Sequence, residues 1–239
     1  MEPTNRTARI AGFFYLLLIV SGIFSILYVP SELILWDNAA ETVQNITSSQ
    51  LLFKLGILGN LVCFTCFIAV PVVLFRLLRS VKQEQAALMV VFALTSVPIS
   101  YLNIVNHMDV LALIDNVQYA NIHGVDSLNS EVMLLLESFN NGTLVAHVFW
   151  GLWLFPFGYL VYQSGFLPKF FGVMLMLGCI GYLIDFLGYF LFEGYGGSLV
   201  SDIAGIPASV GEIGICLWLL IKGVGTNKIN KGDGAIAHG

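Results

Sequence analysis

Several ionisable and amide side chains stand inside long apolar runs of this 239-residue chain. A charged group in lipid hydrocarbon is costly, so such groups usually face the interior of a helix bundle or a water-filled cavity. The deepest of them is Glu212, which lies about 15 Å along a helix from Lys222. A carboxylate at that depth could bind a cation or a hydrogen-bonding small molecule.

Three further polar residues on other apolar runs fall at a height similar to one another, and Glu212 lies deeper than they do. At about 1.5 Å per residue, His147, Asp185 and Asn60 each lie about 24 Å from the end of their run that is closest to basic residues. Separate helices could therefore bring these side chains together in the outer half of a bundle.

Asn103, Asn106 and His107 have the i, i+3 and i+4 spacing that places residues on one face of a helix. On another run, Trp150 follows His147 at helical spacing and could supply an aromatic wall. These patterns predict a polar pocket that opens outward. The alternative is structural, because amide side chains also hydrogen-bond between membrane helices. The candidate pocket residues are Asn60, Asn103, Asn106, His107, His147, Trp150, Asp185 and Glu212.

A metal site is a second interpretation of the same residues. Imidazole and carboxylate groups suit zinc, and a site with three protein ligands leaves a position for water. His107, His147 and Asp185 would be the ligands of a membrane-embedded metal-dependent hydrolase, and Glu212 would be its general base. Support is weak, because the sequence has no H-E-x-x-H, G-x-S-x-G or phosphate-binding loop. The chain therefore favours a non-enzymatic protein and indicates no particular cofactor.

Six apolar runs must position these residues. Each run can cross about 30 Å of hydrocarbon as a helix, the form that satisfies all backbone hydrogen bonds within one segment. The runs cover residues 10–28, 51–78, 86–114, 143–162, 167–192 and 203–221. Thr47 and Gln50 have the spacing of a capping box ahead of the second run, and Pro98 is expected to kink the third. We predict an all-α polytopic membrane bundle of six transmembrane helices.

Basic residues give this bundle an orientation. Every Lys and Arg except Lys54 falls on one side of the six-run pattern, whereas the connections on the other side are acidic. Cytoplasmic segments of membrane proteins are enriched in Lys and Arg. Both termini are therefore expected to be cytoplasmic, in a multi-pass protein of the bacterial plasma membrane.

Composition agrees with this class. Apolar residues make up 57% of the chain and charged residues 10%, with a mean hydropathy of +0.85, unlike a soluble domain. The sequence shows no pattern for nucleic-acid binding, so the expected partners are the lipid bilayer and a small-molecule or cation ligand. Cys63 and Cys66 form a C-x-x-C within an apolar run, where they are expected to pack as small hydrophobic residues.

The chain is organised as one transmembrane domain, residues 1–222, and a tail. The tail, residues 223–239, is expected to be disordered and cytoplasmic. Two long connections, residues 31–49 and 115–141, are rich in Asn, Ser and acidic side chains. Any accessory structure outside the membrane must come from these two connections. The oligomeric state does not follow from the sequence.

Several strings carry a family resemblance: RTARIAGFFYLLLIVSG, NITSSQLLFKLGILGNL, ALTSVPISYLNIVN, FWGLWLFPFGYLVYQSGFLPKFFGVMLMLGCIGYLID and GEIGICLWLLIKGV. With them the chain resembles, from Arg6 to Val224, a family of bacterial six-helix membrane proteins classified as a domain of unknown function. The resemblance implies that residues 149–153, the 165–169 turn, Asp185 and Glu212 are characteristic motifs. It implies the architecture and no activity.

The leading hypothesis is a non-enzymatic protein that binds a small molecule or cation in an outward-facing pocket, as a transporter-like or sensing component. Glu212 would be the deep charge, and Asp185 and His147 would be ligands at intermediate depth. The metal-dependent hydrolase and a purely structural or assembly role remain the alternatives.

Overall fold

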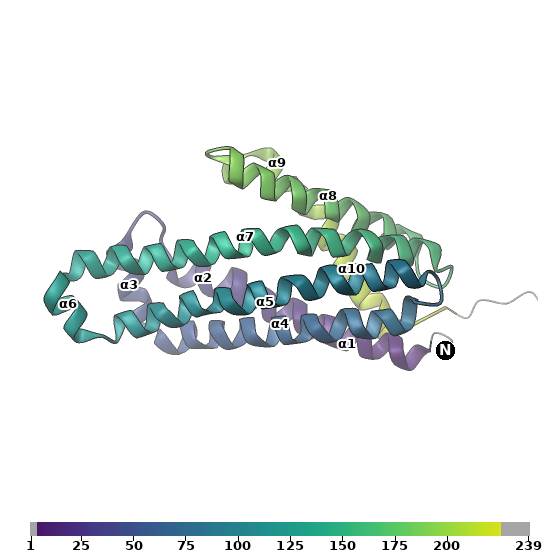
Figure 1. Ribbon diagram of the computed structural model, residues 1–239, viewed down its shortest axis with the longest axis horizontal. Helices are drawn as coiled ribbons and strands as arrows, with labels where there is room; N and C mark the ends of the chain where they lie inside the picture. Colours follow the sequence, from purple (N-terminus) through teal and green to yellow (C-terminus); the bar gives the residue numbers. More distant parts are fainter. Residues whose placement is uncertain (1–3, 226–239) are drawn as a thin grey trace, which may run out of the picture.

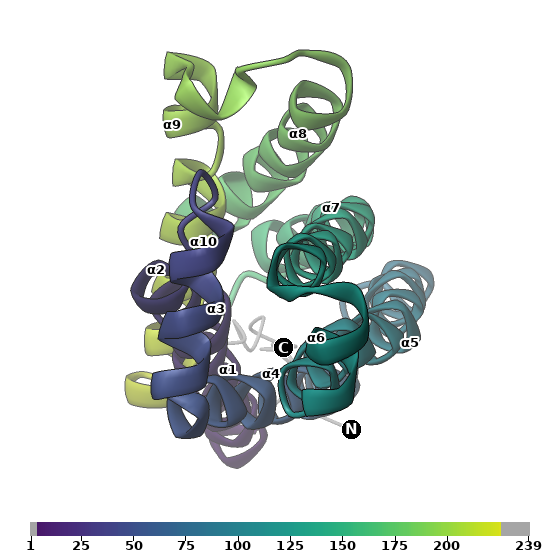
Figure 2. The same cartoon turned by 90° about the vertical axis from the view of Figure 1, so that its left-hand side faces the viewer.

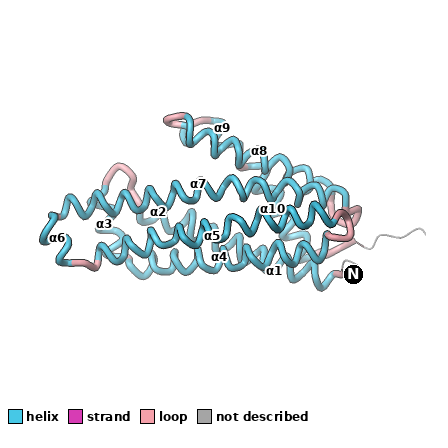
Figure 3. The backbone as a smooth tube through the Cα atoms, in the orientation of Figure 1, coloured by secondary structure: helices cyan, strands magenta, loops and turns pink. Residues whose placement is uncertain are grey.

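The chain forms a bundle of α-helices. The computed structural model describes residues 4–225, which contain helices and loops but no strand (Figure 3). Six helical segments in this range are long and apolar enough to span a membrane: Asn5–Leu33, Gln50–Leu78, Gln83–Ile114, Val125–Gln163, Lys169–Leu191 and Leu199–Ile221. The predicted all-α architecture with six membrane helices is confirmed.

The individual elements follow one another closely (Figure 1). The first three spanning segments and their connections contain α1 (Asn5–Gly22), the π-helical segment η1 (Ile23–Tyr28), α2 (Val29–Leu33), α3 (Ala39–Ser48), α4 (Gln50–Leu78) and α5 (Gln83–Ile114). The rest contains α6 (Val117–His123), α7 (Val125–Gln163), α8 (Lys169–Leu191), the 3-10 turn η2 (Tyr195–Gly197), α9 (Leu199–Ala204) and α10 (Ile206–Ile221).

The six long helices form a closed ring in chain order. Each of α1, α4, α5, α7 and α8 packs against the next long helix, and α10 packs back against α1 (Figure 2). Inside the ring, aromatic side chains of non-neighbouring helices also meet, as Tyr15 of α1 does with Trp153 of α7 at a ring distance of 6.1 Å. The ring therefore has a centre onto which α1, α4, α7, α8 and α10 all project side chains.

Glycines allow the closest helix contacts in the ring. A Cβ atom on Gly158 of α7 would lie 2.5 Å from the Gly172 carbonyl oxygen of α8, too close for any side chain. On α1, a Cβ on Gly12 would lie 2.6 Å from the Leu220 nitrogen of α10, and the Cys216 thiol donates to the Gly12 carbonyl oxygen at 3.5 Å. Small residues at such contacts are typical of membrane helices, where packing rather than hydrophobicity drives association.

The two ends of the ring differ in charge. Arg6, Arg76, Lys82, Lys169 and Lys222 each lie at or next to a helix end on the same side of the bundle, which we call the basic end. We call the opposite side, where α3 and α6 lie, the acidic end (Figure 1).

Lys54 is the exception to this pattern. It lies toward the acidic end, where its ammonium group donates to the Gln50 side chain at 3.1 Å. The Gln50 amide in turn donates to Asp115 at 2.8 Å, so Lys54 belongs to a polar network that joins α4 to the end of α5.

The acidic end carries a helical extension. At 39 residues, α7 is about 58 Å long, against about 30 Å of bilayer hydrocarbon. Leu128, Val132, Leu136 and Phe139 line one face of its first half and are buried. They belong to one of two hydrophobic cores of the bundle, which we call the second core and to which α2, α3, α4 and α5 also contribute. The second core consists of Val29, Leu33, Ile46, Phe53, Ile57, Cys63, Phe64, Ile104, Val110, Leu128, Val132, Leu136 and Phe139.

The extension changes two sequence-based expectations. The fourth helix was expected from Thr143 but begins at Val125, because the Asn, Ser and acidic residues on its outer face hid the apolar face. The accessory structure does come from residues 31–49 and 115–141, as expected, in the form of α3, α6 and the first half of α7.

The predicted capping box is wrong. Thr47 lies inside α3, where its hydroxyl donates to the Val43 carbonyl at 2.7 Å. The residue before α4 is Ser49, and its side chain makes no capping hydrogen bond. A separate short helix, α3, occupies the residues that were expected to cap α4.

Pro98, which was expected to kink the third membrane helix, lies inside α5, and the helix continues through it to Ile114. The predicted disordered tail falls mainly on residues 226–239, which lie outside the described residues. Of its first residues, Gly225 donates a backbone hydrogen bond to Phe166 at 3.1 Å and Val224 to the Asn5 side chain at 2.9 Å.

Candidate ligand-binding cavity

A cavity of about 350 Å³ lies at the centre of the ring. Side chains of α1, η1, α4, α7, α8 and α10 line it, so it depends on the closed arrangement of the helices. Its walls combine aliphatic side chains with a polar and aromatic set: Tyr15, Cys63, Phe64, Phe67, His147, Trp150, Trp153, Tyr182, Ser209 and Glu212. Mostly apolar walls with a few polar groups are typical of small-molecule sites.

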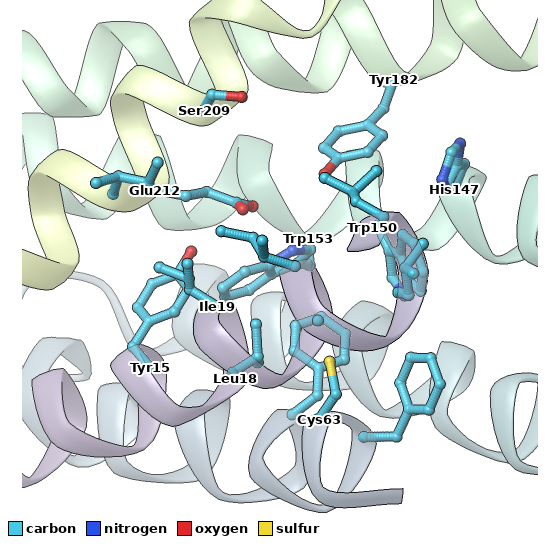
Figure 4. Close-up of a pocket in the computed structure, with 17 residues that line it drawn as sticks. Tyr15, Leu18, Ile19, Cys63, His147, Trp150, Trp153, Tyr182, Ser209 and Glu212 are labelled. Atoms are coloured by element: carbon cyan, nitrogen blue, oxygen red, sulfur yellow. The ribbon is translucent and has the colours of Figure 1, made fainter. Parts of the chain in front are cut away.

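Glu212 supplies the one carboxyl group of this cavity wall among the described residues. It comes from α10, and its side chain extends into the cavity (Figure 4). The described lining contains no Lys or Arg. Because an unpaired charge in an apolar interior is strongly unfavourable, this position is suited to a bound group that carries a positive charge or donates hydrogen bonds.

Two tyrosines meet Glu212 at the cavity. The hydroxyl groups of Tyr15 and Tyr182 point toward the Glu212 side chain from α1 and α8 (Figure 4). Tyr15 is fully buried, and its hydroxyl has no hydrogen-bond partner within residues 4–225. An unsatisfied buried hydroxyl calls for an explanation, and a ligand in the adjacent cavity would provide the missing partner.

His147 presents a second unsatisfied polar atom. Its ring packs between Trp150 and Tyr182, with ring centroids 5.0 and 5.4 Å away. Its Nδ1 atom is buried and lacks a hydrogen-bond partner in the part of the chain that the structure describes, as does Nε1 of Trp150. His147 and Trp150 therefore both line the cavity, and each has a ring nitrogen without a hydrogen-bond partner among the described residues.

Aromatic faces complete the walls. Trp150 stacks on Phe64 at 6.0 Å, and Trp153 meets Phe67 edge to face at 5.2 Å. Aromatic rings attract cations through the negative charge density of their faces, most strongly in the case of tryptophan. The cavity thus combines a carboxyl group with aromatic surfaces, which is a suitable environment for an organic cation.

The structure places the α5 residues elsewhere. The Asn103 amide donates to the Phe139 carbonyl at 2.7 Å and to the Thr143 hydroxyl at 3.2 Å, and Asn106 donates to the Asn103 side chain at 3.1 Å. His107 stacks on Phe139 with ring centroids 3.7 Å apart. These residues join α5 to α7 in the second core and do not line the cavity.

Asn60 and Asp185 also have protein partners outside the cavity lining. Asn60 Oδ1 accepts a hydrogen bond from Ser25 of η1 at 3.0 Å, which ties η1 to α4. Asp185 accepts one from the Tyr195 hydroxyl at 2.8 Å, and this bond fixes the 195–197 turn on α8. Burial and the hydrogen bond with Asp185 raise the pKa of Tyr195 to about 12, so the hydroxyl keeps its proton at neutral pH.

The suggested metal site does not assemble. Within residues 4–225, no three His, Cys, Asp or Glu side chains lie close enough together to hold a metal ion. The three expected ligands occupy different places: His107 in the second core, His147 at the cavity and Asp185 against Tyr195. Separate helices carry them, and the packing of the ring keeps them apart.

Sequence reasoning missed Tyr15 and Tyr182. Both lie in apolar runs, where a tyrosine is normally taken as a core or interfacial residue. The depth argument that selected Glu212 could have found them, because Tyr15 lies about 14 Å from Arg6 and Tyr182 about 20 Å from Lys169. These depths lie close to that of Glu212.

Comparisons with known proteins identify a relative and a family of this chain. An uncharacterized protein of Archaeoglobus fulgidus is 29% identical over 168 residues, which are 70% of this chain and 83% of that protein. No solved structure matches the chain. The family described as Domain of unknown function (DUF4386) matches residues 10–223, nearly the whole described range, in agreement with the resemblance in the sequence. The chain therefore belongs to the DUF4386 family.

Proposed function

We propose that this multi-pass membrane protein binds a small organic cation in the central cavity, as a transporter-like or sensing component. One observation carries the proposal: the Glu212 carboxyl group extends into an aromatic cavity whose described lining contains no Lys or Arg. A positively charged ligand would compensate the charge of the Glu212 carboxylate, and the described lining has no Lys or Arg side chain that does so.

The other lining groups fit an ammonium ion. Trp150 and Trp153 line the cavity, and cation–π contact with a tryptophan ring is worth about 2 kcal/mol when the cation is desolvated. The ammonium group could donate hydrogen bonds to the Glu212 carboxyl group. The volume of about 350 Å³ falls within the range of natural small-molecule sites.

A hard metal ion fits this cavity less well than an organic cation. Calcium takes six to eight oxygen ligands, and magnesium requires a near-ideal octahedron. The oxygen-bearing side chains of the described lining are Tyr15, Tyr182, Ser209 and Glu212, and only one of these four is a carboxylate. Apolar and aromatic side chains make up the rest of the wall and suit carbon atoms of a ligand.

A fluorescence titration tests the proposal. Two of the four tryptophans of the chain line the cavity, so ligand binding should change the emission of protein purified in detergent. We expect butylammonium to produce a saturable change and the neutral 1-pentanol, of similar size, to produce none at the same concentration. Equal responses to both compounds, or no saturable response to butylammonium, would contradict cation binding.

We also infer that the basic end faces the cytoplasm, with both termini inside the cell and the acidic end outside. The charge difference between the two ends supports this orientation. A reporter that is active only in the cytoplasm should work when it is fused after Gly225 and fail when it is inserted in the α6–α7 connection at Gly124. The opposite pattern would reverse the orientation.

A further inference from the structure

The first membrane helix changes its geometry beside the cavity. Residues Ile23–Tyr28 form η1, and single π-helical segments within α-helices are frequent at functional sites. The Ser25 hydroxyl of η1 donates to the Ser21 carbonyl at 2.7 Å and to Asn60 of α4 at 3.0 Å. The bond to Asn60 holds η1 against α4. The other neighbour of α1 in the ring is α10.

The cavity has an opening between η1 and α10, which we call the portal. Ile23 and Leu27 of η1 line the cavity and are nevertheless 49% and 63% exposed. On α10, Ser209 and Ile213 also line it, and Ile213 is 43% exposed. A side chain that belongs to a cavity wall and is also widely accessible marks an opening. These four residues define the portal.

The portal follows from the way α1 and α10 diverge. Near the basic end the two helices touch at Gly12, where the Cys216 thiol reaches the Gly12 carbonyl oxygen. Toward the acidic end α10 stays with α8, since a Cβ on Gly178 would lie 2.7 Å from Ala208. The α8 and α9 region leans away from the rest of the bundle (Figures 1 and 2). The gap between η1 and α10 therefore widens from the Gly12 contact toward the acidic end.

Core side chains lie on both sides of the cavity along the axis of the bundle. Toward the basic end, Leu74, Leu77 and Leu160 are fully buried in the ring. Toward the acidic end, the second core occupies the space between α2, α3, α4, α5 and α7. The portal lies on the side of the bundle, within helices that are apolar enough to lie in lipid. A ligand that reaches the cavity through it comes from the bilayer.

We propose that the ligand is an amphiphilic amine that enters sideways from the bilayer through the portal. This inference rests on the proposed binding of a cation at Glu212. The ammonium head lies at Glu212 among the aromatic side chains, and the alkyl chain passes between Ile23, Leu27 and Ile213 into the surrounding hydrocarbon. The apolar portal residues favour such a chain, because it can keep its apolar contacts while the charged head leaves the bilayer for the cavity.

Photolabelling in lipid nanodiscs tests this inference. The probe is dodecylammonium with a photoreactive diazirine near the middle of its chain, and mass spectrometry locates the labelled residues. We expect labelling at the portal residues of η1 and α10, removed by excess unlabelled dodecylammonium and reduced about tenfold or more by Glu212→Gln. Labelling spread evenly over the lipid-facing surface, unaffected by the competitor, would overturn the inference.

Variants at the portal add a second readout. Leu27→Trp and Ile213→Trp should narrow the opening and slow the labelling several-fold. Val20→Trp is the matched control, because Val20 is 57% exposed on α1 and does not line the cavity. Unchanged labelling rates in both portal variants would overturn lateral entry.

A water-soluble amine separates this inference from the proposed function. If butylammonium binds in a Glu212-dependent manner while dodecylammonium does not label the portal, the ligand is a soluble amine: the lateral inference fails and the cation site stands. If butylammonium does not bind and labelling by dodecylammonium does not depend on Glu212, both fail.

Discussion

The Ser25 hydroxyl of η1 donates a 3.0 Å hydrogen bond to the Asn60 side chain of α4, and both residues are buried. This bond lies beside the cavity and joins its first helix to its second. The bond gives Asn60 Oδ1 a hydrogen-bond donor, whereas Asn60 Nδ2 is buried without a partner among the described residues. This contact ties η1, two of whose residues line the portal, to α4.

Ser25→Ala should therefore lower stability by about 1–3 kcal/mol, because it leaves the Asn60 carbonyl oxygen buried without its partner. Thermal unfolding in detergent would measure the loss. Ser48→Ala, at an exposed position of α3, is the control and should have little effect. An unfolding midpoint for Ser25→Ala equal to that of the wild type would show that the bond does not hold η1.

Asn103→Ala should destabilise the protein without changing ligand binding. The substitution removes two hydrogen bonds from α5 to α7, and we expect a loss of about 1–3 kcal/mol. Asn140→Ala, at an exposed position of α7, is the matched control. Thermal unfolding and a butylammonium titration of the same samples would check both parts. A lower affinity for butylammonium with unchanged thermal stability would contradict this prediction and would show that Asn103 belongs to the binding site.

Substitutions of His147 and Asp185 should have different effects, although the two residues lie at a similar depth along their apolar runs. His147→Phe keeps an aromatic ring in the cavity wall but makes that part of the wall less polar, so the affinity for butylammonium should fall several-fold. Asp185→Asn should leave the affinity unchanged, because its partner is Tyr195. Isothermal titration calorimetry on the two variants measures this difference. Equal losses in both would contradict the placement of the ligand beside His147.

Gly158→Ala should disrupt the contact between α7 and α8. The added Cβ would lie 2.5 Å from the Gly172 carbonyl oxygen, so the helices must move apart, at a cost of about 1–3 kcal/mol. Gly205→Ala is a suitable control, since nothing lies within 4 Å of a Cβ at that position. Equal thermal stability of the two variants would show that the ring tolerates a wider contact there.

The apolar runs were sufficient to predict the number and order of the membrane helices. They were not sufficient for the acidic end, because half of α7 lies on residues whose polar outer face resembles a loop. Leu128, Val132, Leu136 and Phe139 form the pattern that would have revealed the helix. The short helix α3 was missed because Thr47 and Gln50 match a capping pattern, so the residues before Gln50 were taken as a connection. In the structure Thr47 lies inside α3 and does not cap α4.

The depth of each residue along its apolar run predicted some of the residues that line the cavity. It selected Glu212 and His147, which do line it, and helical spacing from His147 added Trp150, which also lines it. It also selected Asn60 and Asp185, which do not line it, because depth says nothing about direction around the helix axis. Asn103 and His107 were selected by their shared helix face, and spacing does not say which neighbouring helix that face meets. Which face of α5 meets α7 follows from the packing of the whole ring, and no local pattern in the sequence contains that information.

The measurement that most directly tests the central claim is the affinity of butylammonium for the Glu212→Gln variant. Glutamine keeps the size of the side chain and removes its charge, so we expect about a tenfold or larger loss of affinity by calorimetry. Glu137→Gln, at an exposed position of α7 outside the cavity lining, should bind as the wild type does. Thermal unfolding confirms that each variant is folded. A folded Glu212→Gln protein that binds butylammonium as tightly as the wild type would contradict the account.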